Sequence, residues 1–191
     1  MAKALTQKQG QQLLKLARQT LETKLADGSA VLPSPPGDQV LSAKAATFVT
    51  LKIAGKLRGC IGTLEPTEVL WEGIRNNAIN AAFHDPRFSP LTPEELPAVL
   101  LDISILSPAQ PLSYEKPEDL PAKLRPGIDG VILRDGSRRA TFLPQVWQQL
   151  PTAEQFLDHL CLKAGLPERT WQHKQLEILT YQVQCFEEKK E

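Results

Sequence analysis

Prolines divide much of this chain into short elements. The segment Pro33-Ser34-Pro35-Pro36-Gly37 cannot continue a helix or enter a sheet interior, so it is expected to cross the surface in an extended form. Between Pro108 and Pro126 the prolines again separate short elements. A chain of 191 residues can still bury a sizeable core, and one domain or two closely packed lobes are expected.

Helix signals occur near both ends and in the middle. Thr6 to Gln9 reads as a capping box before an apolar face that Asp27-Gly28 ends. Thr152 to Gln155 is a second box, before a helix that ends at Gly165 and Pro167. A further helix runs from Leu70 to about His84, because Pro86 disfavours helical backbone before it. Thr92-Pro93-Glu94-Glu95 predicts a short helix.

Alternating segments predict strands between these helices. Val49 to Ile53 and Leu57 to Thr63 flank a turn and form a β-hairpin, and a strand follows at 101–105. A second hairpin surrounds Asp135-Gly136, and the last strand covers 176–186. On that strand Leu179, Tyr181, Val183 and Cys185 share one side, so the C-terminus is expected to rejoin the main sheet. The pattern is that of an α+β fold.

The run Leu57-Arg58-Gly59-Cys60-Ile61-Gly62 is the best site candidate. With a period of two, Leu57 and Ile61 face one side, for packing, while Arg58 and Cys60 face the other. The arginine charge could then lower the pKa of the thiol and favour a nucleophilic thiolate. The alternative is that Cys60 is a packing residue and Arg58 an ion-pair partner or a surface charge.

The glycines of this run also need a reason, since glycine weakens a strand interior. They indicate a bulge or the close approach of another backbone or a ligand, and they suggest an uncovered shelf beside Cys60.

The other thiols and the histidines give weaker signals. Cys161 and Cys185 both fit core positions, and three widely spaced cysteines are typical of a reducing compartment. A thiol enzyme needs a base, and His84 is the one histidine that could reach Cys60. No spacing of ligating residues indicates a metal site, and no cofactor is predicted.

The loop Asp85-Pro86-Arg87-Phe88-Ser89-Pro90-Leu91 combines a carboxylate, a guanidinium and a ring within four residues. It can present a recognition surface. Alternatively, Asp85 caps a turn, Arg87 pairs with it or with a carbonyl group, and Phe88 attaches the loop to the core.

Composition narrows the function classes. Acidic and basic residues both number 22, so no single-sign field is available to attract nucleic acid or a membrane surface. The sequence has no secretory signal, no membrane-spanning stretch and no phosphate-binding glycine loop, which predicts a cytoplasmic protein. The arginines at 134, 138 and 139 are interpreted as a solvated edge.

These residues resemble the AMMECR domain family. Leu57 to Gly62 is identical to the signature hexapeptide of that family, and further matches run down nearly the whole chain. They are Thr63, Asp85-Pro86-Arg87-Phe88, Pro90-Leu91, Glu95-Leu96, Gly127, Asp129-Gly130, Thr141-Phe142-Leu143-Pro144, Val146 and Lys163-Ala164-Gly165. The prokaryotic branch resembles protein A of the AmmeMemoRadiSam system, whose association implies a Memo-like protein and a radical-SAM protein as partners.

The resemblance implies one domain with two lobes. The larger lobe, 1–106 plus 172–191, has an antiparallel sheet and flanking helices, and a smaller α+β lobe, 107–171, is inserted. The hexapeptide would face a cleft between them. No established reaction follows from the resemblance, and the family pattern does not specify histidine at position 84.

Three functions are therefore considered. The first is an accessory binding protein that holds a protein segment or a modified small molecule against the run Leu57 to Gly62 and against Asp85, Arg87 and Phe88. The second is an enzyme with Cys60 as nucleophile and Arg58 as the stabilising cation. The third is RNA binding, which zero net charge places last.

Overall fold

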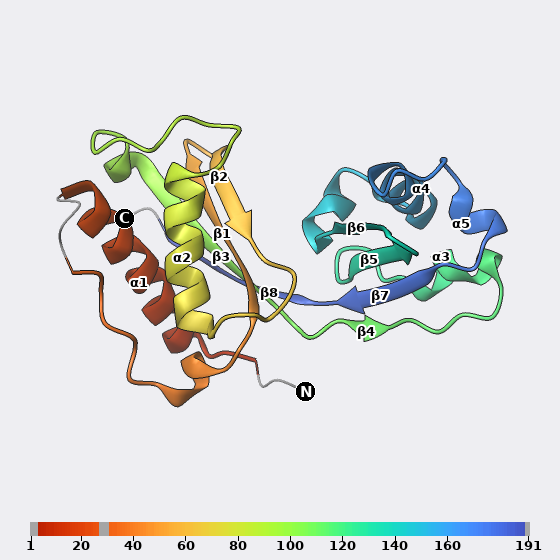
Figure 1. The fold of residues 1–191 in the computed structure, drawn as a ribbon, viewed down its shortest axis with the longest axis horizontal. Helices are drawn as coiled ribbons and strands as arrows, with labels where there is room; N and C mark the ends of the chain where they lie inside the picture. The colour runs from red at the N-terminus through yellow and green to blue at the C-terminus, as the bar shows by residue number, and fades with distance from the viewer. Residues whose placement is uncertain (1–3, 27–30, 190–191) are drawn as a thin grey trace. The chain divides into compact units, whose positions relative to one another are not determined.

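The computed structural model describes residues 4–26 and 31–189, and the predicted helix stop at Asp27-Gly28 lies outside them. The chain has an α+β fold with two antiparallel sheets, as the sequence predicted (Figure 1). Within the described residues, no helix combines the length and the apolar character needed to cross a membrane.

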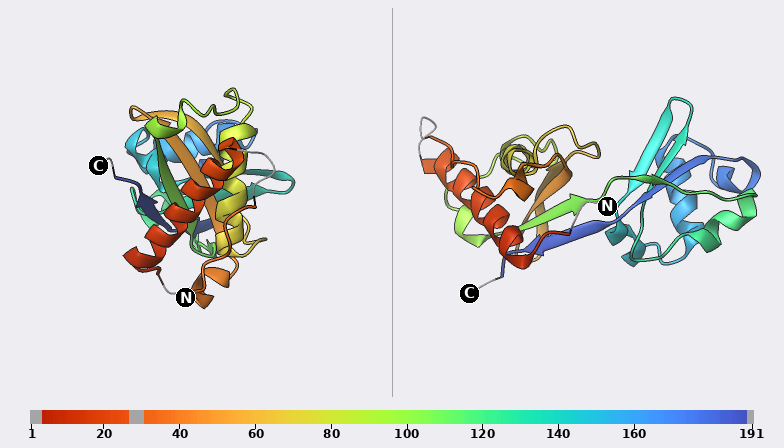
Figure 2. Two further views of the ribbon diagram at one scale, coloured as in Figure 1. Left: turned by 90° about the vertical axis from the view of Figure 1, so that its left-hand side faces the viewer. Right: turned by 90° about the horizontal axis from the view of Figure 1, so that it is seen from below.

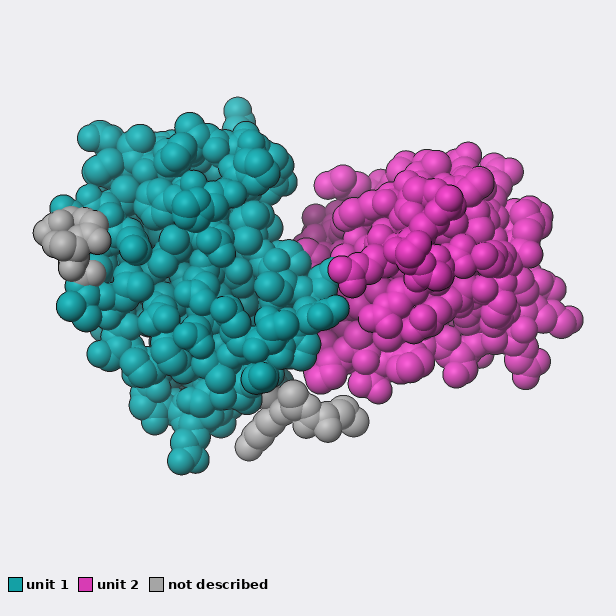
Figure 3. All heavy atoms as spheres, in the orientation of Figure 1, with its two compact units in different colours: residues 1–106, 184–191 teal, residues 107–183 magenta. Residues whose placement is uncertain are grey.

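The chain forms two compact units, coloured separately in Figure 3. Unit 1 holds residues 1–106 and 184–191, and unit 2 holds residues 107–183. The chain enters unit 2 at Ser107. The return to unit 1 occurs at 184 instead of 172, because residues 172–183 include a strand that pairs inside unit 2.

Unit 1 is a four-stranded sheet with two helices on one face, α1 and α2, as Figures 1 and 2 show. The strand order is β2-β1-β3-β8, so β2 is an edge strand. The described elements are α1 (Gln7–Ala26), η1 (Gln39–Ser42), β1 (Ala46–Ile53), β2 (Lys56–Gly62), α2 (Leu70–Phe83), η2 (Leu96–Ala98), β3 (Val99–Leu106) and β8 (Val183–Glu187).

Local sequence explains the main elements of unit 1. The N–H of Gln9 donates to Thr6 Oγ1 and the N–H of Thr6 to Gln9 Oε1, so the first capping box is confirmed. The hairpin turns at Ala54 and Gly55, both with positive φ, as two-residue turns between twisted strands require. The core lies between the helices and the sheet, and its fully buried side chains include Leu13, Leu21, Val49, Leu51, Ile74, Leu101 and Ile103.

Unit 2 has its own sheet, of order β4-β7-β5-β6, and its own core. Its elements are β4 (Gln110–Pro111), η3 (Pro117–Asp119), α3 (Leu120–Lys123), β5 (Gly130–Asp135), β6 (Arg138–Phe142), η4 (Pro144–Gln148), α4 (Ala153–Lys163), α5 (Thr170–His173) and β7 (Glu177–Tyr181). Helix α4 begins at its predicted cap, where the Gln155 N–H donates to Thr152 Oγ1. The Phe156 ring stacks on Trp147 with centroids 3.9 Å apart.

Two predicted elements differ from the structure. The single last strand is two strands in different sheets, β7 and β8, which separate at Gln182. Cys185 therefore has no shared face with Tyr181 and is exposed, so its predicted core position is wrong. Residues 93–95 form turns before η2 instead of an α-helix, although the Thr92 N–H does donate to Glu95 Oε2 at 3.0 Å.

Candidate functional site

A β-bulge at Arg58 changes how strand β2 presents its side chains. Gly59 lies opposite Leu51 while Leu57 lies opposite Lys52, so Arg58 has no partner residue on β1. The bulge puts Ile61 and Leu57 on different faces: Ile61 packs against the core, whereas Leu57 is 43% exposed. The prediction that both residues pack on one face is wrong, because period-two alternation does not continue through a bulge.

Neighbouring atoms occupy the space beside both glycines of the run, Gly59 and Gly62. A Cβ at Gly59 would overlap the carbonyl oxygen of Ala81 in α2, and a Cβ at Gly62 would overlap the Phe48 ring and the Thr47 carbonyl oxygen. Glycine thus permits helix α2 and an aromatic ring to approach β2. The predicted uncovered shelf beside Cys60 does not exist at these two positions.

Arg58 joins β2 to the loop that follows α2. Its guanidinium forms a bidentate pair with Glu95, with Nε to Oε1 at 2.8 Å and Nη2 to Oε2 at 2.9 Å. It also donates to the carbonyl oxygens of Ser89 and Pro90. The side chain is only 13% exposed, and the Glu95 carboxylate raises the pKa of Arg58 while Arg58 lowers that of Glu95. Arg58 is therefore an ion-pair partner that stabilises the loop.

Asp85 is the buried anchor of the site. Its carboxylate accepts the Cys60 N–H at 2.9 Å and forms a bidentate pair with Arg87, with Oδ1 to Nε at 2.9 Å and Oδ2 to Nη2 at 2.7 Å. It also caps its own turn by accepting the Arg87 N–H. The Arg87 guanidinium holds the pKa of Asp85 far below its usual range, although burial acts in the opposite direction. The backbone N–H groups of Cys60 and Arg87, which donate to the carboxylate, lower this pKa further.

Arg87 is a cation that contacts the backbone of the motif cysteine. Besides pairing with Asp85, its Nη2 donates to the Cys60 carbonyl oxygen at 3.3 Å. Hydrogen bonding to Asp85 raises the pKa of Arg87, and the negative charge of Asp85 acts in the same direction. The side chain is 53% exposed, and no acceptor for Nη1 is found among the described residues. Arg87 consequently has one open donor group.

Phe88 and the Cys60 thiol complete the site. The guanidinium carbons of Arg87 and Arg58 lie 5.4 and 6.0 Å from the Phe88 ring centroid, so this half-buried ring lies by the two cations and outside the hydrophobic core. Thr50 Oγ1 lies 3.2 Å from Cys60 Sγ and donates to it. These contacts join residues of unit 1.

The candidate base His84 makes no hydrogen bond to the thiol in the part of the chain that the structure describes. His84 is the C-cap of α2 and is exposed, and none of the hydrogen bonds among the described residues joins it to Cys60. Residues 4–26 and 31–189 contain no group of three His, Cys, Asp or Glu side chains placed to hold a metal ion. Cys161 is buried, as predicted, and burial raises the pKa of its thiol.

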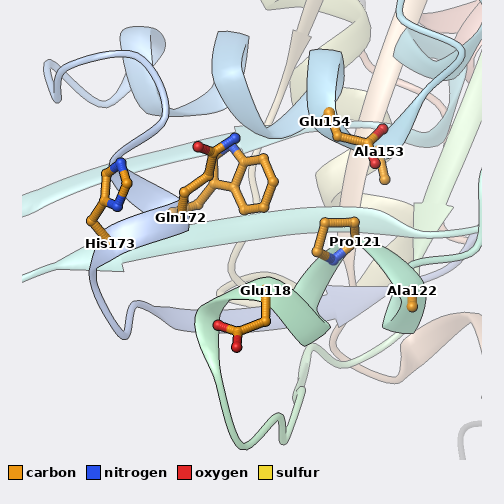
Figure 4. A pocket seen from close by; sticks show the side chains of 8 residues that line it. Glu118, Pro121, Ala122, Ala153, Glu154, Gln172 and His173 are labelled. Atoms are coloured by element: carbon orange, nitrogen blue, oxygen red, sulfur yellow. The ribbon is translucent and has the colours of Figure 1, made fainter.

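Each unit also has a surface hollow. One of about 320 Å³ in unit 1 lies just after the motif, lined by Thr63, Thr67, Glu68, Asn76, Asn77, Ile79 and Asn80. One of about 640 Å³ in unit 2 has Trp171 among its lining residues, and Figure 4 labels the others. Its other lining residues are Glu118, Pro121, Ala122, Ala153, Glu154, Gln172 and His173, none of which was a predicted site residue.

Sequence reasoning missed Glu95 and Thr50 as members of the site. Glu95 was interpreted only as a helix-capping residue, and it also pairs with Arg58, 37 residues away. Thr50 alternates with the apolar Val49 and Leu51, which puts it on the polar side of its strand. Its register opposite Cys60 follows from the hairpin, so the alternation itself was the available signal.

Comparisons with known proteins agree on one family. The family model described as AMMECR1 matches residues 14–186. A protein of Methanothermobacter thermautotrophicus is 40% identical, with 96% of each chain covered, and one of Thermofilum pendens is 37% identical, with 96% of this chain and 92% of the other covered. The crystal structure of uncharacterized protein PH0010 from Pyrococcus horikoshii has a TM-score of 0.86 and 33% identity, and the match covers 96% of this chain and 93% of that one. This chain belongs to the AMMECR1 family.

Proposed function

We propose that the chain is a binding protein that holds an anionic group of its ligand on Arg87, beside Cys60. One observation carries this proposal: Nε and Nη2 of Arg87 are fixed by the buried Asp85, while Nη1 has no acceptor among the described residues. A guanidinium fixed in this way loses little side-chain freedom on binding, and carboxylate and phosphate oxygens are its preferred acceptors.

The surroundings of Cys60 favour binding over catalysis. A thiol nucleophile is normally activated by a base that a third group orients. The described contact of Cys60 Sγ is the Thr50 hydroxyl, which has no basic character at neutral pH. Arg58, proposed from the sequence as the stabilising cation, is neutralised by Glu95.

A thiol enzyme is the second candidate, because Arg87 donates to the Cys60 carbonyl oxygen and so places a cation beside this residue. In that case Cys60 would react with iodoacetamide much faster than Cys161 and Cys185, and a measured pKa above about 8.5 would exclude it. RNA binding has less support, since acidic and basic residues both number 22 and no single-sign field is available to attract a polyanion. It would show a steep loss of affinity with added salt.

The binding proposal is tested with acetate and inorganic phosphate as probes, observed by NMR. We expect either anion to shift the Arg87 Nε–H and Cys60 amide signals. Arg87→Ala alone would leave Asp85 buried without its cation, so the test compares Asp85→Asn with Asp85→Asn/Arg87→Ala. The carboxamide oxygen introduced by Asp85→Asn can still accept the Cys60 N–H in both variants.

We expect Asp85→Asn to retain a weakened shift of the Cys60 amide, because Arg87 is less firmly held but keeps its charge, and the double variant to lose the shift. Cys60→Ser should leave anion binding largely intact. An unchanged response in the double variant would refute the proposal. The partner proteins are a separate proposal: a Memo-like and a radical-SAM protein from the same organism should co-purify with the wild type and less with the double variant.

A further inference from the structure

The outer edge of β2 is blocked at Cys60 by two side chains. In an edge strand, alternate residues turn both N–H and C=O away from the sheet. Cys60 does so: its N–H donates to Asp85 and its carbonyl oxygen accepts from Arg87. The Asp85–Arg87 pair therefore takes the place of a neighbouring strand at this residue.

The next outward-facing residue, Gly62, is open. The Thr63 N–H donates to the Thr47 carbonyl oxygen, so Thr63 faces β1 and Gly62, one residue earlier, faces the edge as Cys60 does. No hydrogen bond from a described residue reaches the outward N–H or C=O of Gly62. This gap lies between Arg87 and the start of the 63–68 segment.

The polar hollow of unit 1 begins where the open edge ends. Beyond Thr63 the chain leaves the sheet and returns at Glu68, whose carbonyl oxygen accepts the Ala45 N–H. Asn77, only 4% exposed, is fixed by donating to Thr47 O and Oγ1, and Asn76 donates to Glu68. Asn80 makes no described side-chain hydrogen bond, so its amide is available in the hollow.

We infer that the ligand is the C-terminal segment of a partner protein, which adds to β2 as a short antiparallel strand. This inference rests on the proposed function. The terminal carboxylate binds Arg87 Nη1, an upstream residue exchanges two hydrogen bonds with Gly62, and a polar side chain further upstream enters the hollow. Charge complementarity at Arg87 sets the direction, because the carboxylate lies at the Cys60 end and the peptide runs toward it from Thr63.

The probe is a pool of fluorescein-labelled tetrapeptides with randomised sequence and a free carboxylate, screened by fluorescence polarisation. On the tightest peptide, amidation of the C-terminus should weaken binding at least about ten-fold, the loss expected for one charge-assisted hydrogen bond. In a scan of N-methylated backbones, one position should lose binding while its two neighbours do not, because alternate amides face the strand edge. Asn80→Ala should weaken the same peptide several-fold.

The outcomes separate this inference from the proposal beneath it. If N-methylation is tolerated everywhere, or if no peptide binds while acetate still shifts Arg87, strand addition is wrong and anion binding stands. If the Asp85→Asn/Arg87→Ala change alters the binding of neither acetate, nor phosphate, nor any peptide, then both strand addition and anion binding at Arg87 are wrong.

Discussion

The Asp85 carboxylate accepts the backbone N–H of Cys60 at 2.9 Å, so a side chain from the loop after α2 replaces a neighbouring strand at the edge of β2. The residue that bonds Cys60 is itself only 4% exposed and is paired with Arg87. Stability of this edge and the position of the open guanidinium therefore depend on one buried carboxylate.

Asp85→Asn should destabilise unit 1 at neutral pH by roughly 1–3 kcal/mol, because a charge-assisted pair to Arg87 is lost while an acceptor for Cys60 remains. The folded-state pKa of Asp85 lies below its unfolded value of about 3.9. Its stabilisation is thus complete above about pH 5 and is lost as pH falls below about 4. Hydrogen exchange of the β1 amides should show the difference between wild type and variant shrinking in acid.

The exposed carboxylate Glu118, which has no described ion pair, is the matched control. Glu118→Gln should change neither the stability nor its pH profile. A difference between wild type and Asp85→Asn that stays constant from pH 7 to pH 3 would contradict the assigned role of Asp85.

Gly59→Ala should lower the free energy of unfolding by about 1–3 kcal/mol, the usual range for overpacking a core. The new methyl group would overlap the Ala81 carbonyl oxygen and force α2 away from β2. Gly37→Ala is the control, since no atom lies within 4 Å of a Cβ there and its φ is not positive. Urea unfolding followed by amide signals of α2 gives both values. Equal stability of the two variants would show that Gly59 is not a packing requirement.

Arg58→Lys should loosen the loop from Asp85 to Glu95 although the charge is kept. Lysine cannot reproduce the bidentate pair with Glu95 together with donation to two loop carbonyl groups. We expect faster proteolysis within this loop and a free energy of unfolding that is lower by about 1–2 kcal/mol. Arg134→Lys, at an exposed ion pair with Glu177, should change stability by less than about 0.5 kcal/mol. An unchanged cleavage rate in Arg58→Lys would assign Arg58 another role.

Local signals predicted the parts of the fold that depend on neighbouring residues. The capping residues Thr6 and Thr152, the helix end before Pro86 and both hairpins are each determined within a few positions, and the structure has them. Tertiary geometry decided the rest. A bulge changes the face of every residue beyond it, and the split of the last strand at Gln182 depends on which sheet each half joins.

The candidate site shows the same division. The motif and the Asp85–Phe88 loop were both singled out from the sequence, and the structure brings them together. Which arginine accompanies Cys60 was not readable from spacing. Arg58 is two residues away along the chain yet pairs with Glu95, whereas Arg87, 27 residues away, contacts the Cys60 carbonyl group.

The three thiols provide the last prediction. If Cys60 serves binding and not catalysis, alkylation by iodoacetamide should follow accessibility. Cys185 is exposed, Cys60 is half-buried with its sulfur accepting from Thr50, and Cys161 is fully buried with a raised pKa. Mass spectrometry of peptides sampled over time at about pH 7.5 should give the order Cys185, Cys60, Cys161. Thr50→Val removes the hydroxyl donor and should speed alkylation of Cys60 only modestly. If wild-type Cys60 instead reacts far ahead of Cys185, the thiol is activated, and the enzyme replaces the binding protein as the better account of this site.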